Sequence, residues 1–182
     1  MVKSMISEKL KLDETDKQII TLLQENPNLT HSHIAEIVNL SQPTVGNRIK
    51  KLKKEGILQI QPGVNLKKVE LYLAKVEMKT SIPSDIIDMA RFCPFMLNAF
   101  RLIGEHDILI LLVSSKIKNL YNVVDYHFRN NSDVKTVSME IVIEIAKDLI
   151  LPVDLIFDEL NPTPEKGCGI KCTYKKEKLK EI

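Results

Sequence analysis

The stretch LTHSHIAEIVNLSQPTVGNRIKKLKKEGI, residues Leu29–Ile57, has the pattern of two short helices joined by a tight turn. In its second half, Val45, Ile49 and Leu52 recur at the i, i+4, i+7 spacing of a buried helical stripe. Ser41 stands where an N-cap is needed, and the proline two residues later falls in the first turn, where its missing N–H costs nothing. The pattern predicts an amphipathic helix that begins after Ser41.

The face opposite the apolar stripe is polar and cationic. It carries Gln42, Thr44, Asn47, Arg48 and Lys51. Residues 48–54 contain five lysine or arginine side chains, and such a cluster attracts phosphates through counterion release. A capped helix of this kind suits insertion into the major groove of DNA. The same pattern also fits an ordinary amphipathic helix with a solvated basic face.

Composition and charge place limits on the class of protein. The 182 residues suffice for one large or two small domains, and no apolar run could span a membrane. The polar N-terminus lacks the apolar segment of a signal peptide, so we expect a cytoplasmic protein. Three cysteines do not make a disulfide framework. The formal charge is +2 over residues 1–62, −3 over 63–164 and +3 over 165–182.

The first domain is expected over residues 1–62. Asp13 is a plausible N-cap for a first helix through Gln24, and Thr30 caps the next helix, whose buried positions are predicted to be Ile34, Ile37 and Val38. The cationic helix is expected over residues 42–55, with Gly56 ending it. Residues 57–60 then read as a short strand, which makes three helices and a small wing. Residues 63–69 are predicted to be a linker.

The second domain, residues 70–151, alternates strand and helix patterns. Strands are predicted at 71–79, 96–103, 107–113 and 136–146, with helices starting at Pro83 and over 117–128. This βαββαβ order predicts an α+β, ferredoxin-like sheet with helices on one face. The last strand looks too apolar for a sheet with one solvated face, so we expect at least a dimer. The residues behind this expectation are Val137, Ile141, Val142, Ile143 and Ile145.

A winged helix-turn-helix followed by a βαββαβ domain of the RAM type resembles the Lrp/AsnC, or feast/famine, family of transcription regulators. The resemblance covers about residues 12–151. It rests on LDETDKQIITLLQENPNLTHSHIAEIVNLS, on SQPTVGNRIKKLKKEGIL and on IGEHDILILLV, in this order and spacing. The family implies dimers that often assemble into octamers, that bind partly palindromic promoter DNA, and that commonly sense amino acids.

The resemblance also implies functions for individual residues of the cationic helix. The residues that match its DNA-contacting positions, together with the neighbouring lysines, are Gln42, Thr44, Asn47, Arg48, Lys50, Lys51 and Lys54. Arg48 is the leading candidate, because a guanidinium can bind a phosphate or a guanine edge through two hydrogen bonds. Asn47 could read adenine. The lysines are expected to meet phosphate or only water.

The turn Gly104-Glu105-His106-Asp107 matches the effector-binding turn of the family. A turn that begins with glycine exposes backbone N–H groups that could take a carboxylate, and Asp107 could take an ammonium. Alternatively, the glycine only makes a hairpin that the aspartate stabilises. In the fourth strand, hydroxyl residues common in amino-acid-sensing members give way to Val137 and Met139, which is a departure from the family pattern.

The segment 152–182 extends beyond the family pattern. It contains Cys168 and Cys172, separated by three residues and flanked by lysines. Nearby cations lower thiol pKa values, so the pair could be redox-active; two such tails could supply four thiolates to zinc or an iron–sulfur cluster. A reduced tail without a ligand is equally consistent with the spacing. The remaining thiol, Cys93, precedes a proline at the end of an apolar helix and is expected in the core.

The sequence favours a sequence-specific DNA-binding regulator over two alternatives. The first is an enzyme on the same scaffold, since siroheme decarboxylases resemble Lrp/AsnC proteins in both domains. Around the stretch RLIGEHDI, residues 101–108, the chain has no tyrosine or tryptophan of the kind that surrounds a tetrapyrrole, and no catalytic motif occurs elsewhere. The second is an architectural DNA protein with little sequence preference. No enzyme activity is therefore expected.

Overall fold

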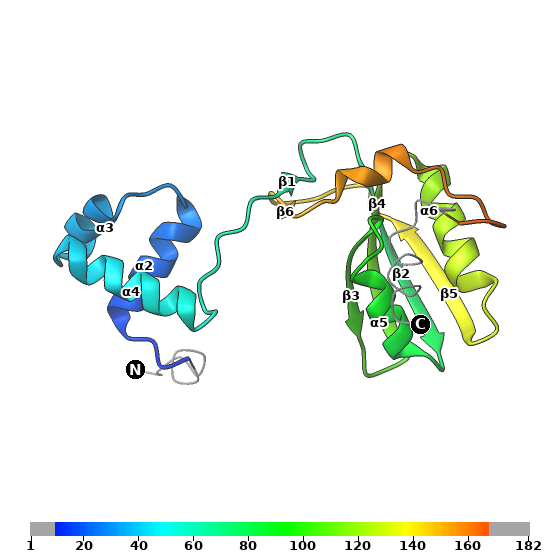
Figure 1. Ribbon diagram of the computed structural model, residues 1–182, viewed down its shortest axis with the longest axis horizontal. Coiled ribbons are helices and arrows are strands. Elements are labelled where there is room, and N and C mark those ends of the chain that lie inside the picture. The colour runs from blue at the N-terminus through cyan, green and yellow to red at the C-terminus, as the bar shows by residue number, and fades with distance from the viewer. Residues whose placement is uncertain (1–9, 168–182) are drawn as a thin grey trace, which may run out of the picture. The chain divides into compact units, whose positions relative to one another are not determined.

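The computed structural model describes residues 10–167, which belong to two compact units, one up to Gln61 and the other from Pro62 (Figure 1). Each unit has its own hydrophobic core. Helices dominate the first unit, and an antiparallel sheet dominates the second, so the α+β fold class is confirmed. Within residues 10–167, no helix is long and apolar enough to cross a bilayer.

Three helices make the first unit: α2 (Glu14–Glu25), α3 (His31–Val38) and α4 (Gln42–Lys54). Each begins after a predicted N-cap, whose side-chain oxygen accepts the backbone N–H three residues later: Asp13, Thr30 and Ser41. Asn39 ends α3 in the left-handed conformation, with φ of 53°. Gly56, with φ of 70°, lets the chain turn away just after α4. These local signals were all readable in the sequence.

The core of the first unit draws on all three helices. Its buried members are Ile19, Leu23, Ile34, Ala35, Val45, Ile49, Leu52 and Leu58. The prediction that Ile37 is buried was wrong, because its side chain is 53% exposed whereas Ala35 is 5% exposed. In an eight-residue helix, the positions that face two neighbouring helices form a narrow stripe. Ala35 occupies this stripe, next to Ile34.

The wing strand predicted at residues 57–60 does not form. The N–H groups of Ile57 and Leu58 instead donate to the Leu52 carbonyl at 3.0 and 3.2 Å, which caps the end of α4 and leaves them unavailable to a strand partner. The next strand, β1 (Val64–Asn65), pairs antiparallel with β6 (Ile150–Leu151). Residues 63–69, expected to be a linker, therefore lie in the second unit, where Leu66 is buried.

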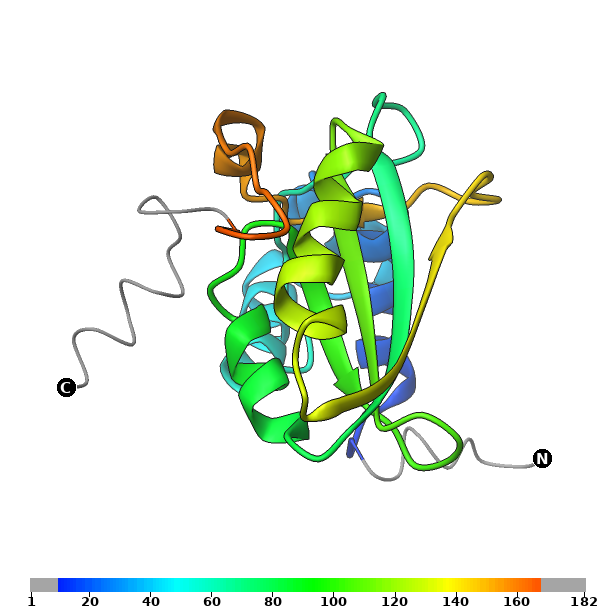
Figure 2. The same cartoon turned by 90° about the vertical axis from the view of Figure 1, so that its right-hand side faces the viewer.

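The second unit is a four-stranded antiparallel sheet with strand order β3-β4-β2-β5, covered on one face by two helices (Figure 2). Its strands are β2 (Tyr72–Thr80), β3 (Met96–Arg101), β4 (Ile108–Ser114) and β5 (Val134–Ile141). Its helices are α5 (Pro83–Ala90) and α6 (Ile117–Val124), the latter continued by a π-helical turn, η1 (Asp125–Arg129). This is the predicted ferredoxin-like order.

Strand β5 directs apolar side chains toward the helices of its own unit. Val76 and Met78 of β2 are fully buried beneath the helices, and they pair with Met139 and Val137 of β5. Directly opposed residues share a face of the sheet, so the apolar side chains of β5 point toward the helices. Val137 and Ile141 therefore face the helices, whereas Ile143, beyond the strand, is 97% exposed, and the dimer stays a prediction. The strand also stops at Ile141, five residues before its predicted end.

The face of the sheet that the helices leave open is charged along β2 and β5 and apolar along β3 and β4. Lys75 of β2 lies 3.0 Å from Glu77 and 2.8 Å from Glu140, and hydrogen bonds first to Glu140 and then to Glu77 raise its pKa. On the β3–β4 side, Phe100 is 43% exposed and pairs with Leu109. This face is therefore only partly apolar.

Residues after β6 fold back onto the helical face of the second unit (Figure 1). A short 3₁₀ turn, η2 (Leu155–Glu159), places Phe157 in the core, 1% exposed and with its ring centroid 6.0 Å from that of Phe95. From α6, the side-chain amides of Asn119 and Asn122 donate to the carbonyls of Leu160 and Pro162 at 3.4 and 2.7 Å. This part of the C-terminal extension is thus integral to the domain.

Candidate nucleic-acid interface

Helix α4 is anchored along one side and exposed along the other. Val45, Ile49 and Leu52 are 0%, 4% and 2% exposed, so the stripe predicted from the sequence is confirmed. At its start, Ser41 Oγ accepts the Thr44 N–H at 3.3 Å and lies 2.7 Å from Thr44 Oγ1. The capped first turn carries polar groups at the end of the helix that, in helix-turn-helix proteins, reaches the bases.

Six of the seven predicted DNA-contacting side chains lie on the exposed surface of α4: Gln42, Thr44, Asn47, Lys50, Lys51 and Lys54. A hollow of about 450 Å³ beside the helix is lined by Lys11, Asp13, Asp16, Thr44, Asn47, Arg48 and Lys51. Amide, hydroxyl and ammonium groups therefore share one surface, as a DNA-reading helix requires.

Arg48, the leading candidate, is half-buried and already paired. Its Nη1 donates to Asp13 Oδ2 at 2.6 Å and to Asp16 Oδ1 at 2.8 Å. Asp13 is the N-cap of α2, and it forms a capping box with Asp16. The guanidinium therefore ties the DNA-facing helix to the first turn of α2. Sequence reasoning missed these two carboxylates, because nothing local connects residues more than thirty positions apart.

The ion pairs change the electrostatics of the cluster. The Asp16 backbone N–H, followed by Arg48, lowers the pKa of Asp13, and hydrogen bonds to Asp13 and then Asp16 raise the pKa of Arg48. The Asp16 side chain is only 9% exposed, so its charge needs this partner. Arg48 consequently contributes a smaller net positive potential to the surface than the exposed lysines do.

The predicted effector turn lies in the second unit, between β3 and β4. Gly104 has φ of 153° with open space around it, and Glu105 is exposed whereas His106 and Asp107 are half-buried. Asp107 Oδ2 accepts the Thr80 N–H at 2.8 Å, and the Asp107 N–H donates to the Met78 carbonyl at 2.9 Å. The aspartate therefore ties the turn to the end of β2, which is the hairpin-stabilising function considered above.

The cysteines divide between the core and the tail. Cys93 is buried, as predicted, at 5% exposed. The pair Cys168 and Cys172 lies outside the described residues, so its proposed thiol chemistry stays a prediction. Within residues 10–167, no three histidine, cysteine, aspartate or glutamate side chains gather as a metal site would require.

Comparisons with known proteins agree with this geometry. Residues 12–59 match the family model described as winged helix-turn-helix DNA-binding. An HTH-type transcriptional regulator of Pyrococcus horikoshii is 28% identical in an alignment of length 144 that covers 75% of this chain and 96% of the relative.

Solved structures extend the match into the second unit. A transcriptional regulator of Neisseria meningitidis, solved as its L-Met complex, has a TM-score of 0.68 at 26% identity, covering 80% of this chain and 99% of that one. AsnC from E. coli, at 18% identity, shares the fold with a TM-score of 0.64 over 75% of this chain and 95% of its own. The chain is thus similar, in its DNA-binding unit and in its fold, to winged helix-turn-helix transcription regulators of the Lrp/AsnC type.

Proposed function

We propose that this regulator is sequence-specific and reads promoter DNA by inserting α4 into the major groove, with two copies of the chain reading two half-sites. One observation carries the proposal: α4 buries an uninterrupted apolar stripe and exposes amide and ammonium groups on the opposite side. A helix held in this way presents its polar side chains in a fixed geometry, which is what base recognition needs.

The residues of α4 divide by chemistry into base readers and phosphate binders. The amides of Gln42 and Asn47 can pair with the N6 and N7 edge of adenine. Lys50, Lys51 and Lys54 suit phosphates, whose contacts fix position without reading sequence. Arg48 holds α4 against α2 through its Nη1, and only its remaining N–H groups are left for a phosphate.

Binding to DNA upstream of the chain's own gene, compared with random DNA, tests the proposal. Preference for the upstream DNA, with two chains per site, supports a specific dimeric regulator; equal affinity for both would favour an architectural protein. Repeating the measurement after oxidation tests whether Cys168 and Cys172 control binding.

A shift in the absorption band of added siroheme would instead indicate the enzyme alternative, which the names of the relatives do not favour.

Asn47→Ala should weaken binding to the upstream site by about ten- to a hundredfold and leave random-DNA binding nearly unchanged, because it removes a base contact worth roughly 1–3 kcal/mol. Lys51→Ala should weaken binding to the upstream site and to random DNA alike, and should lower the salt dependence of the DNA affinity. Fluorescence anisotropy with labelled duplexes measures both effects. Lys118→Ala, an exposed lysine of the second unit, is the control. Unchanged affinity in both α4 variants would refute this placement of the DNA-reading surface.

We also propose that the turn Gly104–Asp107 binds an amino acid. The L-Met complex of the Neisseria relative and the open space around Gly104 support this. Titration with L-methionine, L-leucine and L-asparagine should shift the amide resonances of the turn, because backbone N–H groups would receive the ligand carboxylate. If none of the three shifts these resonances, the turn serves only to stabilise the hairpin.

A further inference from the structure

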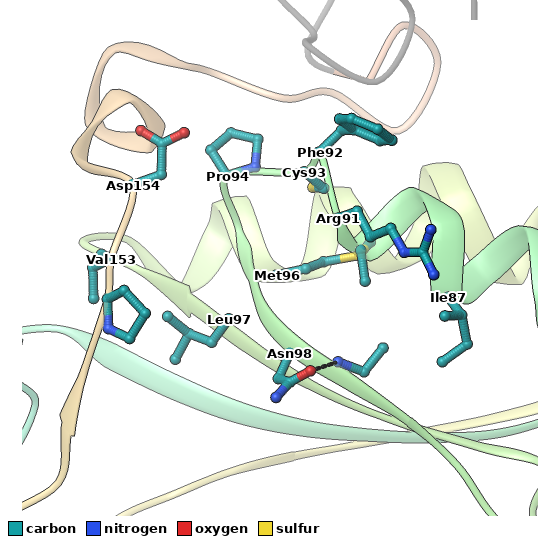
Figure 3. Close-up of a pocket in the computed structure, with 13 residues that line it drawn as sticks. Ile87, Arg91, Phe92, Cys93, Pro94, Met96, Leu97, Asn98, Val153 and Asp154 are labelled. Carbon is teal, nitrogen blue, oxygen red and sulfur yellow. Dashed lines mark hydrogen bonds between the residues drawn. The ribbon is translucent and has the colours of Figure 1, made fainter. Parts of the chain in front are cut away.

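A cavity of about 630 Å³ opens in the second unit between the end of α5, the first half of β3 and residues 152–154 (Figure 3). Its volume falls in the range typical of small-molecule sites. The turn Gly104–Asp107 follows the C-terminal end of β3, whereas the cavity lies beside the first four residues of the strand, 96–99. The cavity is therefore separate from the predicted effector turn.

The wall formed by residues 152–154 is held at both ends. Before it, Leu151 pairs with Val64 in the β1–β6 ladder. After it, Phe157 is buried against Phe95, which directly precedes Met96 of the opposite wall. Both walls are therefore fixed to one core without a ligand. Residues 152–154 open the segment 152–182, so the cavity depends on the start of that segment.

The lining is apolar at its base, with Met96, Leu97 and Val153, and has two sources of hydrogen-bond donors. Arg91 has a 68% exposed side chain and one ion pair, to Asp88 at 3.3 Å, which leaves most of its N–H groups available.

The second donor is the side-chain amide of Asn98. Its Oδ1 accepts the Ala99 N–H at 2.9 Å, and its Nδ2 donates to no group in the described part of the chain (Figure 3). Asn98 pairs with Leu111 of β4 whereas Met96 pairs with Leu112, so the amide lines the cavity from the other face of β3 and is separate from Arg91.

Asp154, the acidic residue of the lining, already accepts a hydrogen bond. Asp154 caps η2, and its Oδ1 accepts the Ile156 N–H at 3.1 Å. In Figure 3, Asp154 and Arg91 lie on opposite sides of the cavity. An anionic group would therefore bind on the Arg91 side, away from the aspartate, with its apolar part against Met96, Leu97 and Val153.

We propose that this cavity binds a small amphipathic carboxylate, such as a short or branched fatty acid. Arg91 binds the carboxylate, and the apolar base covers the hydrocarbon. A guanidinium is suited to this ligand class because its fork of donors matches the two carboxylate oxygens.

Titration of the full chain with isocaproate, followed by calorimetry and amide chemical shifts, tests the proposal. We expect saturable binding with shifts centred on residues 96–99 and 153. Arg91→Gln should weaken it about tenfold, because one charge-assisted contact is lost. Arg101→Gln is the matched control, an exposed arginine at the other end of β3. Isocaproamide, which has the same shape without the charge, should bind about tenfold more weakly.

Three results would overturn the proposal. The first is no saturable binding of isocaproate, butyrate or caprylate by the unmodified chain. The second is binding that Arg91→Gln leaves unchanged, or shifts centred on the turn Gly104–Asp107. The third is equal affinity for the acid and its amide, which would make the cavity an unselective apolar hollow. Since Arg91 is exposed, its replacement should leave the fold intact, and the thermal unfolding midpoint verifies this.

Discussion

Replacing Arg48 with alanine should lower the free energy of unfolding of the first unit by about 1–3 kcal/mol, since it leaves a nearly buried Asp16 carboxylate without its partner. An arginine that only contacted DNA would change stability by less than about 0.5 kcal/mol. Residues 1–61 contain no aromatic side chain of Phe, Tyr or Trp, so intrinsic fluorescence does not report on them. Hydrogen exchange at the backbone amides of α2 and α4 measures the stability of this unit instead.

A double-mutant cycle separates the ion pair from other effects of the substitution. Asp16→Asn removes the charge but keeps an oxygen for the Asp13 N–H of the capping box. If the Arg48–Asp16 ion pair stabilises the unit, Arg48→Ala should lower the free energy of unfolding clearly less in the Asp16→Asn background. The coupling energy should then be about 1 kcal/mol or more. Lys53→Ala, an exposed lysine of the same helix, is the control. Additive effects would show that Arg48 does not stabilise the unit through Asp16.

The pH dependence of stability provides a further readout for the same cluster. The pKa of Asp13 is lowered in the folded protein, so its contribution is present above its unfolded pKa of about 4 and is lost as the pH falls through the lower folded value. Protection of the α2 amides should therefore decline below about pH 4, and Arg48→Ala should flatten this decline. An unaltered pH profile in the variant would contradict the pairing seen here.

The sequence was sufficient for the starts of the helices and for the buried stripe of α4. Asp13, Thr30 and Ser41 were recognised as caps because a capping side chain bonds to its own helix. The buried stripe of α4 follows from helical periodicity alone. Both the helices and the exposed face of the candidate interface could therefore be predicted.

What the sequence could not supply depends on pairing between distant segments. In residues 137–143 one alternating set is apolar and the other carries Ser138 and Glu140, but only the pairing with β2 shows that the apolar set meets the helices rather than a second subunit. The partners of Arg48 are another such pairing, between α4 and α2. Fine differences also escaped prediction, such as whether residues 57–60 would cap α4 or extend as a wing strand.

The second large effect is expected from Phe157→Ala, which should lower the unfolding free energy of the second unit by about 3–5 kcal/mol. The ring is 1% exposed, and removing it leaves a cavity against Phe95. Chemical denaturation followed by tyrosine fluorescence measures the change, because Tyr121 and Tyr126 belong to this unit. Leu155→Ala, in the same turn but 62% exposed, should cost less than about 1 kcal/mol.

Hydrogen exchange in α2 and α4 should stay unchanged in Phe157→Ala, since those helices have a separate core. If Phe157→Ala lowers the unfolding free energy of the second unit by less than about 1 kcal/mol, residues 155–160 do not pack onto the domain in solution. The same variant bears on the carboxylate cavity, because Phe157 is the anchor that follows Asp154. Weaker isocaproate binding in Phe157→Ala but not in Leu155→Ala would show that the extension both completes the core and holds one wall of the ligand site.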